Sequence, residues 1–159
     1  MKNPLIIQFD LHQKLFNNVL EGFSDEETNQ RLHGDKKMNH VKYLAGHLLN
    51  AQYGFGLLAG IQQNVKWNDL FAAGNQSKAQ DDILYPTIKE IKTEWNELYQ
   101  PIGKALENLT EEDLNKKAPI DFWKTANEMW AFLNHHQAYH IGQIGILRRG
   151  FGKEAMRYD

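Results

Sequence analysis

Apolar residues recur at three- and four-residue steps over four long stretches of the chain, and no stretch shows a convincing alternation with a period of two. Such spacing is typical of one face of an α-helix. It predicts long helices over residues 5–21, 39–58, 86–109 and 125–149. The pattern therefore predicts an all-α protein in which four long helices form a four-helix bundle around a shared core.

Residues that favour helix ends support these boundaries. Asn39 is a good N-cap for the second helix, and Pro86 suits the first turn of the third. Thr125 and Glu128 have the spacing of a capping box at the start of the last helix. Pro101 lies inside the third helix, where a missing N–H predicts a kink or a local break.

Shorter elements are predicted between the long ones. The capping-box sequence Ser24–Glu27 predicts a short helix that ends near residues 33–34, and residues 110–114 predict one more capped turn. Residues 60–80, which include the Gly74–Ser77 run, predict a long connection with a single helical turn over 67–72. Its length suits a crossover between two helices that run parallel, or a loop over a functional site.

Length and composition limit the class of protein. A chain of 159 residues with 42% hydrophobic residues is expected to form one domain over residues 1–159. Its net charge of −2 does not favour nucleic-acid binding. No apolar run approaches the roughly 20 residues of a membrane span, and the first residues do not resemble a secretory signal. We therefore expect a soluble, cytoplasmic protein without a nucleic-acid or membrane partner.

The last helix carries two histidines, His136 and His140, on one face. Residues four apart on a helix have Cβ atoms about 5–6 Å apart, which lets two imidazoles bind one metal ion. The apolar residues around them predict that both point inward, where unpaired imidazoles would be unfavourable. A single histidine on an apolar face is more often an ordinary core residue, so the metal hypothesis needs a third ligand.

His47 is the best candidate for that third ligand, because it lies in the middle of the inward stripe of the second helix. His40 is a second choice, because it lies near the start of the same helix, where we expect water to reach it. His12 is expected to be structural or exposed. Three neutral imidazoles leave a fourth coordination position for water or substrate, as in catalytic zinc sites. The chain has no cysteine, so any thiol must come from a cosubstrate.

Three other metal chemistries fit the residues less well. A zinc protease needs a glutamate base within its histidine motif, but the corresponding residue is Gln137. A di-iron bundle needs Glu-x-x-His pairs on two helices, and the sequence has none. Covalent haem attachment needs Cys-x-x-Cys-His, which a chain without cysteine lacks.

The segments Tyr43–Leu48, His136–Gln143 and Leu147–Arg149 resemble the DinB-like family of DNA-damage-inducible bacterial proteins. The resemblance covers essentially the whole chain. It implies an up-down-down-up four-helix bundle, with a long crossover between the second and third helices. It also implies a divalent metal bound by residues that match His47, His136 and His140. We expect zinc or nickel first, with iron or manganese as alternatives.

Related proteins in this family include transferases and isomerases that act with low-molecular-weight thiols, so the resemblance implies a small-molecule substrate, a thiol cosubstrate and a homodimer. A divalent metal can favour the thiolate form of an incoming thiol and so produce a nucleophile. The ligand set equally allows activation of water. The sequence leaves three hypotheses open: a metal-dependent thiol transferase, a non-catalytic metal-binding or stress-associated bundle, and a purely structural helical domain.

Residues near the motif have smaller predicted roles. Gln143 is expected to be structural or to orient an imidazole, and Gly142 and Gly145 to allow close helix packing. Arg148 and Arg149 favour the helix C-terminus, with an anionic substrate as the alternative. Aromatic residues expected in the core, the crossover or a subunit interface are Trp67, Trp95, Trp130 and Tyr139.

Overall fold

The computed structural model describes residues 2–72 and 78–158, and within these two ranges it is all-helical and contains no strand. The fold class predicted from the hydrophobic pattern is therefore confirmed at this level. The elements are α1 (Lys2–Val19), α2 (Asp25–Thr28), the 3-10 helix η1 (Leu32–Gly34), α3 (Val41–Leu58), α4 (Asn68–Phe71), α5 (Ile88–Asn108), α6 (Glu111–Asn115) and α7 (Ala126–Gly150).

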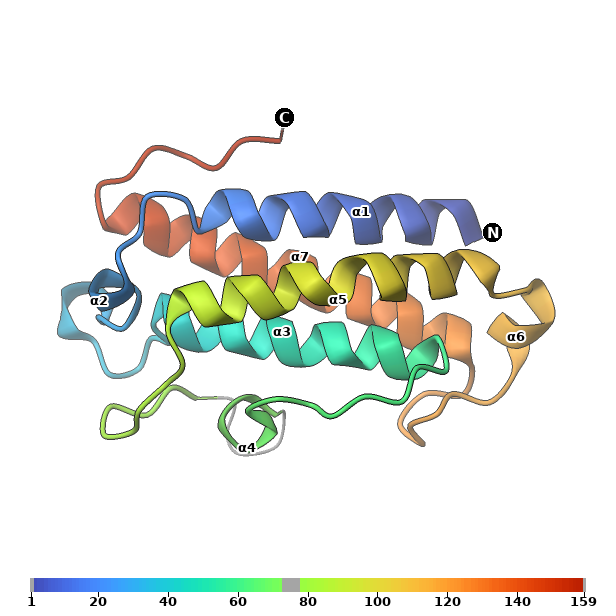
Figure 1. Ribbon diagram of the computed structural model, residues 1–159. Coiled ribbons are helices and arrows are strands. Elements are labelled where there is room, and N and C mark those ends of the chain that lie inside the picture. Colours follow the sequence, from blue (N-terminus) through green and yellow to red (C-terminus); the bar gives the residue numbers. More distant parts are fainter. Residues whose placement is uncertain (1, 73–77, 159) are drawn as a thin grey trace.

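The four long helices α1, α3, α5 and α7 lie side by side (Figure 1). Helix α7 packs against α1 and α3, and α5 packs against the same two helices. The colours of Figure 1 show that α1 and α7 run in one direction along the molecule, while α3 and α5 run in the other. The segment between α3 and α5 therefore returns along the molecule, and α4 lies on this return path.

Large aromatic and aliphatic side chains fill the space between these helices. The Phe16 ring of α1 stacks on Trp95 of α5 with 4.0 Å between centroids, and Phe9 meets Phe55 of α3 edge-on at 5.1 Å. Full burial of a large apolar side chain contributes about 1.5–3 kcal/mol to stability. Residues from all four long helices are among the largest fully buried side chains: Phe9, Phe16, Leu44, Leu48, Leu49, Phe55, Ile91, Trp95, Ile102, Leu106 and Trp130.

The start of α3 differs from the prediction by one residue. His40, not Asn39, is the N-cap, and its Nδ1 atom accepts a hydrogen bond from the Tyr43 N–H at 3.0 Å. The Asn39 side chain instead accepts a hydrogen bond from the Ala79 N–H at 2.8 Å. The prediction was wrong because an imidazole nitrogen can fill the role usually taken by Ser, Thr, Asp or Asn.

The predicted interruption at Pro101 does not break α5, which is continuous from Ile88 to Asn108. Proline cannot donate to the carbonyl group four residues earlier, that of Glu97. Both Glu97 and Pro101 are exposed, so water can reach the side of the helix where this bond is lost. The helix is retained because its opposite face is buried in the core.

The other predicted helix starts are observed in part. Pro86 lies before Thr87, the N-cap of α5, and not in the first turn of that helix. Ser24 and Glu27 form the reciprocal bonds of a capping box at α2. At α7, Thr125 accepts a hydrogen bond from the Glu128 N–H, but the Glu128 carboxylate bonds to the Lys124 N–H instead of to Thr125. The last helix therefore has only half of the predicted box. The helix itself begins at the predicted residue.

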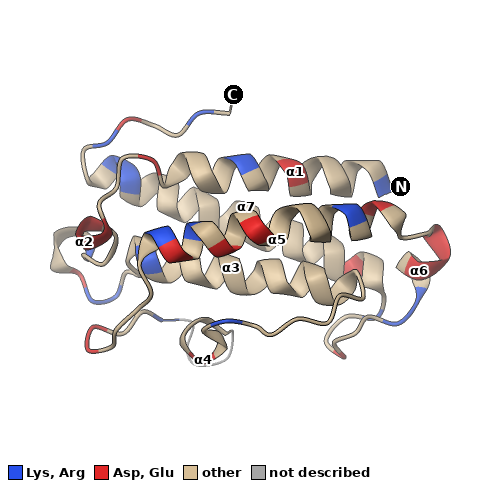
Figure 2. Cartoon of the chain, in the orientation of Figure 1, with Lys and Arg blue, Asp and Glu red and all other residues tan. Residues whose placement is uncertain are grey.

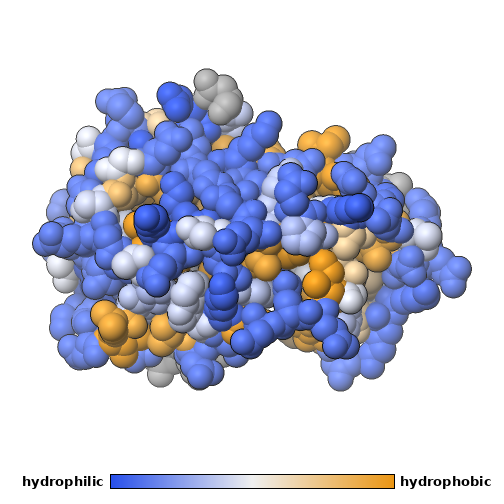
Figure 3. Space-filling model, viewed as in Figure 1, coloured by the Kyte–Doolittle hydropathy of each residue, from blue (hydrophilic) through white to orange (hydrophobic). Residues whose placement is uncertain are grey.

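The crossover contains α4, at the position of the predicted helical turn, while the predicted Gly74–Ser77 loop lies outside the described residues. Polar groups dominate the face shown in Figure 3, with apolar patches between them. None of the helices in residues 2–72 and 78–158 has the length and hydropathy needed to cross a bilayer.

Candidate metal centre

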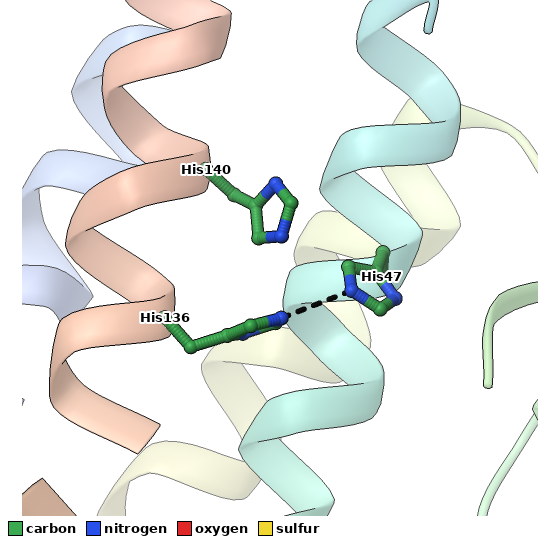
Figure 4. Close-up of side chains that lie close together, drawn as sticks. All are labelled: His47, His136 and His140. Atoms are coloured by element: carbon green, nitrogen blue, oxygen red, sulfur yellow. Dashed lines mark hydrogen bonds between the residues drawn. The ribbon is translucent and has the colours of Figure 1, made fainter. Parts of the chain in front are cut away.

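Helices α3 and α7 bring His47, His136 and His140 together, although the first two are 89 residues apart in the sequence. Figure 4 shows the three rings directed toward one another across the space between the two helices. Their candidate ligand nitrogens all lie within 4.8 Å of one another. The three residues singled out from the sequence therefore form a single cluster.

The separations in this cluster fit a shared ion. The Nε2 atoms of His47 and His136 are 3.0 Å apart, and the ring centroids of the three pairs are 4.5–4.9 Å apart. With zinc–nitrogen bonds of 2.0–2.1 Å, two ligands of a tetrahedral site are separated by about 3.4 Å. Small side-chain rotations would bring the observed nitrogens to that spacing.

His47 is held in a defined tautomer. Its side chain is buried, and its Nδ1 atom lies 2.7 Å from the backbone carbonyl oxygen of Phe71 in α4. A carbonyl oxygen only accepts hydrogen bonds, so Nδ1 must carry the hydrogen, and the neutral ring has its lone pair on Nε2. That lone pair is directed at the other two histidines. The Tyr43 ring stacks on the imidazole with only 6° between the planes.

His140 is held in the same way by Gln143, whose Oε1 atom is 2.7 Å from the imidazole Nδ1. The predicted orienting role of Gln143 is thus seen in the structure. His136 differs, because its buried Nδ1 atom has no hydrogen-bond partner. Two of the three rings are therefore held with the hydrogen on Nδ1, which leaves the lone pair on Nε2, an arrangement typical of metal-binding histidines. In the metal-free protein the His47 lone pair accepts a hydrogen bond of 3.0 Å from His136 Nε2.

The protonation states also suit metal binding. Burial lowers the pKa of His47, His136 and His140. The pKa of His136 falls to about 3, since the neighbouring rings of His140 and His47 add to the effect of burial. All three imidazoles are consequently neutral near pH 7, and a metal ion does not have to displace protons from charged rings.

The surroundings of the cluster are uncharged. Helix α7 has no Asp, Glu, Lys or Arg between Glu128 and Arg148, and α3 has only Lys42. Figure 2 shows these helices as almost uniformly tan. No carboxylate joins the cluster among the described residues. A divalent ion held here would keep its full positive charge.

The buried face of α7 differs from the predicted stripe. His136 and His140 are only half-buried, and Phe132 is 39% exposed. The fully buried side of the helix instead includes Asn134 and Gln137. The apolar residues around the two histidines predicted that both point inward, whereas here two amides are among the fully buried residues. The histidines consequently lie at the edge of the core, next to solvent.

An aromatic wall adjoins the exposed side of the cluster. The Phe132 ring lies 5.7 Å from His136 and 4.9 Å from Trp123, and Trp123 lies 5.1 Å from Phe122. Phe122 is 80% exposed. These three aromatic rings provide an apolar surface that reaches from solvent to His136.

The other candidate residues lie away from the cluster. His40 is buried as the α3 cap, so the expectation that water reaches it was wrong. His12 is buried, and burial lowers the pKa of its imidazole to about 4. Arg148 and Arg149 donate to backbone carbonyl groups, so their side chains stabilise the end of α7.

The glycines and aromatic residues divide between predicted and unexpected roles. A Cβ atom on Gly142 would meet nothing within 4 Å, and one on Gly145 would make only an ordinary contact with Met156. Close helix packing therefore does not explain these glycines. Among the aromatic residues, Trp95 and Trp130 are in the core, Trp67 is partly buried in the crossover, and Tyr139 is 57% exposed.

Sequence reasoning missed the contribution of Phe71. Its role depends on a backbone carbonyl group in an irregular crossover, which no residue pattern identifies. It also missed a hydrogen bond of 2.8 Å between the buried amides of Gln137 and Gln52, which ties α7 to α3 beside the cluster. The only signal in the sequence was the amide of Gln137 next to His136, at the position where a zinc protease has its glutamate base.

Comparison with known proteins identifies the family. No curated protein and no solved structure matches the chain. A family model described as the DinB superfamily matches residues 8–144, a range that includes all three clustered histidines. Because this match covers most of the 159 residues, and because it agrees with the motifs in α3 and α7, the chain belongs to the DinB superfamily.

Proposed function

We propose that this protein binds one divalent metal ion through His47, His136 and His140 and uses it to transfer a low-molecular-weight thiol to an electrophilic small molecule. One observation carries the metal site: three neutral imidazoles from α3 and α7 converge within 4.8 Å. Two of them have Nδ1 hydrogen-bonded to an oxygen acceptor. We further propose that the four long helices form an up-down-down-up bundle that holds these helices in place.

The donor set supports zinc or nickel as the first candidates, with iron or manganese as alternatives. Imidazole nitrogens suit zinc, nickel and iron, whereas manganese is more often bound by oxygen ligands. Three protein ligands leave room for an exogenous ligand, as in catalytic zinc sites. A closed structural site would need a fourth protein ligand, and none joins the cluster in the described chain.

The electrostatics of the site favour an anionic cosubstrate. When bound, a divalent ion supplies a positive charge that lowers the pKa of a thiol or water molecule that reaches it. Because no carboxylate of residues 2–72 and 78–158 joins the cluster to neutralise this charge, a thiolate is a favourable partner. The chain has no cysteine, so the sulfur comes from a diffusible thiol. The exposed aromatic wall beside His136 provides an apolar surface for the electrophile.

The chain's own residues would position the reactants. His47 and His140 are oriented by Phe71 and Gln143, so the three nitrogens would hold one face of the ion. His136 and His140 are half-buried, so solvent can reach this side of the cluster. A non-catalytic metal-binding protein is the alternative, since within the described part of the chain no further His, Asp or Glu belongs to the cluster.

Metal analysis tests the first part of the proposal. The wild-type protein should contain about one divalent ion per chain after metal loading and desalting, and His47→Ala and His140→Ala should each lose most of it. His135→Ala is the matched control, because His135 is exposed on the same helix and lies outside the cluster. Equal metal content in all four proteins would refute the site.

Turnover tests the second part. The metal-loaded protein should transfer a thiol from a panel of low-molecular-weight thiols to a chromogenic electrophile, and a chelator should abolish the reaction until metal is restored. The His135→Ala variant should remain active. A fully metal-loaded protein that shows no transfer with any thiol in the panel would favour the non-catalytic alternative.

A further inference from the structure

Gly46 and the Phe71 ring are in such close contact that no residue with a side chain could replace the glycine without moving the ring. A Cβ atom added to Gly46 would lie 2.2 Å from Cε1 and Cζ of the Phe71 ring and 2.5 Å from Cδ1. These are the three nearest atoms, and all belong to one rigid ring. Even alanine at position 46 would therefore displace Phe71, which is 1% exposed.

The same two residues are directly connected to the metal cluster. Gly46 precedes His47 in α3, and the Phe71 carbonyl oxygen accepts the hydrogen bond from His47 Nδ1 at 2.7 Å. The Phe71 ring is held from other sides as well, with Tyr85 stacked at 5.6 Å and Tyr43 at 6.2 Å between centroids. The position of the Phe71 ring thus determines where its carbonyl group lies.

We infer that Gly46 and Phe71 are positioning residues that together set the tautomer and direction of the His47 ring. The absence of a side chain at position 46 lets the Phe71 ring rest on α3, and this contact places the Phe71 carbonyl beside His47. The carbonyl keeps the hydrogen on Nδ1, so the lone pair of Nε2 faces His136 and His140. The crossover helix α4 is therefore part of the metal site without supplying a ligand.

This inference rests on the proposed function in one respect, because the His47 lone pair matters only if it binds a metal ion. The tautomer of His47 is a property of the metal-free protein and can be measured without any ion. If Phe71 served only to fill the core, displacing it would reduce stability and leave the hydrogen position of His47 unchanged. If Phe71 positions His47, the same displacement would release Nδ1 and let both tautomers form. The two explanations consequently differ in a property that needs no metal to observe.

The test compares Gly46→Ala with Gly142→Ala. Both substitutions add one methyl group within a helix, but a Cβ atom on Gly142 meets nothing within 4 Å. Side-chain ¹⁵N–¹H NMR of the metal-free proteins reports the tautomer of each histidine. Titration of Zn²⁺ against a competing chelator reports affinity, and far-UV circular dichroism reports folding.

In wild type and Gly142→Ala, His47 should be mainly the Nδ1–H tautomer and Zn²⁺ affinity should be equal. In Gly46→Ala, the tautomer preference should be lost and the affinity should fall about 10–100-fold, the usual effect of removing a group that orients a metal ligand. A folded Gly46→Ala protein that keeps the wild-type tautomer and affinity would overturn the inference.

Phe71→Ala and the double variant Gly46→Ala/Phe71→Ala complete the experiment. They also test the inference if Gly46→Ala does not fold. Once the ring is absent, the added methyl group has lost its three nearest clashes, so both variants should have the same reduced Zn²⁺ affinity and the same mixed tautomers. A Phe71→Ala protein with the wild-type tautomer would refute the inference. If wild type binds no Zn²⁺, the proposed metal site fails, while the tautomer measurements still decide the role of Gly46 and Phe71.

Discussion

Replacing Gln137 with leucine should destabilise the protein through its partner Gln52. The two amides are 0–1% exposed, and the Gln137 Nε2–H group donates to Gln52 Oε1 at 2.8 Å. Leucine at position 137 removes this bond and leaves the Gln52 oxygen buried without a donor, which typically costs 1–3 kcal/mol.

The double variant Gln52→Leu/Gln137→Leu separates loss of a hydrogen bond from poor packing. With both amides replaced by apolar groups of similar size, no partner is left unpaired, and the free energy of unfolding should recover most of the loss. Urea unfolding followed by circular dichroism, with a chelator present, measures wild type, Gln52→Leu, Gln137→Leu and the double variant. In a chain of this length each 1 kcal/mol should lower the Tm by about 2–4 °C.

Two outcomes would refute this reasoning. If Gln137→Leu is as stable as wild type, the buried hydrogen bond contributes nothing at this position. If the losses of the two single variants simply add in the double variant, the amides do not interact across the α3–α7 interface. Either result would mean that contacts other than this bond hold the two helices together beside the histidine cluster.

Two further predictions concern pH and helix capping. Burial, and then the charges of Arg31 and Lys42, lower the pKa of His40 from 6.5 to about 4. Between these two values the unfolded chain binds a proton at His40 and the folded protein does not. The stability of the folded protein is therefore unaffected by this group above pH 6.5 and decreases as the pH falls toward 4. Between pH 7 and 5, the free energy of unfolding of chelator-treated wild type should fall by about 2 kcal/mol more than that of His40→Asn, which keeps a capping acceptor but does not titrate. Equal losses in urea unfolding would contradict this. Thr87→Ala removes the α5 cap and should lower the free energy of unfolding by about 1 kcal/mol. The control Thr93→Ala, at an exposed position, should change the free energy of unfolding by less than about 0.5 kcal/mol. Indistinguishable unfolding curves for the two variants would contradict the capping role of Thr87.

Much of the fold was predictable because helical periodicity and caps are local properties. The four long helices and the turn at α4 were predicted from spacing alone. Of the two alternatives predicted at Pro101, the local break was wrong because tertiary packing retained a helix that local geometry disfavours. The inner face of α7 was predicted only in part: the buried amides Asn134 and Gln137 have partners on other elements, and no local pattern reveals such partners.

The candidate site was predictable to the extent that its donors are side chains. The spacing of His136 and His140 and the central place of His47 in its stripe led to the observed cluster. The Phe71 carbonyl group was not predictable, because any residue carries a carbonyl and only the path of the crossover brings this one to His47. The thiol cosubstrate, the small-molecule substrate and the homodimer remain predictions.

The separation of 89 residues between His47 and His136 also determines when a complete set of nitrogens first exists. During synthesis, α3 leaves the ribosome long before α7 has been made, and closing so long a loop is entropically unfavourable until the helices dock. An ion that bridges them is thus acquired after translation of α7. Such an ion would oppose the separation of α7 from α3, because that movement would break its bonds to one of the two helices.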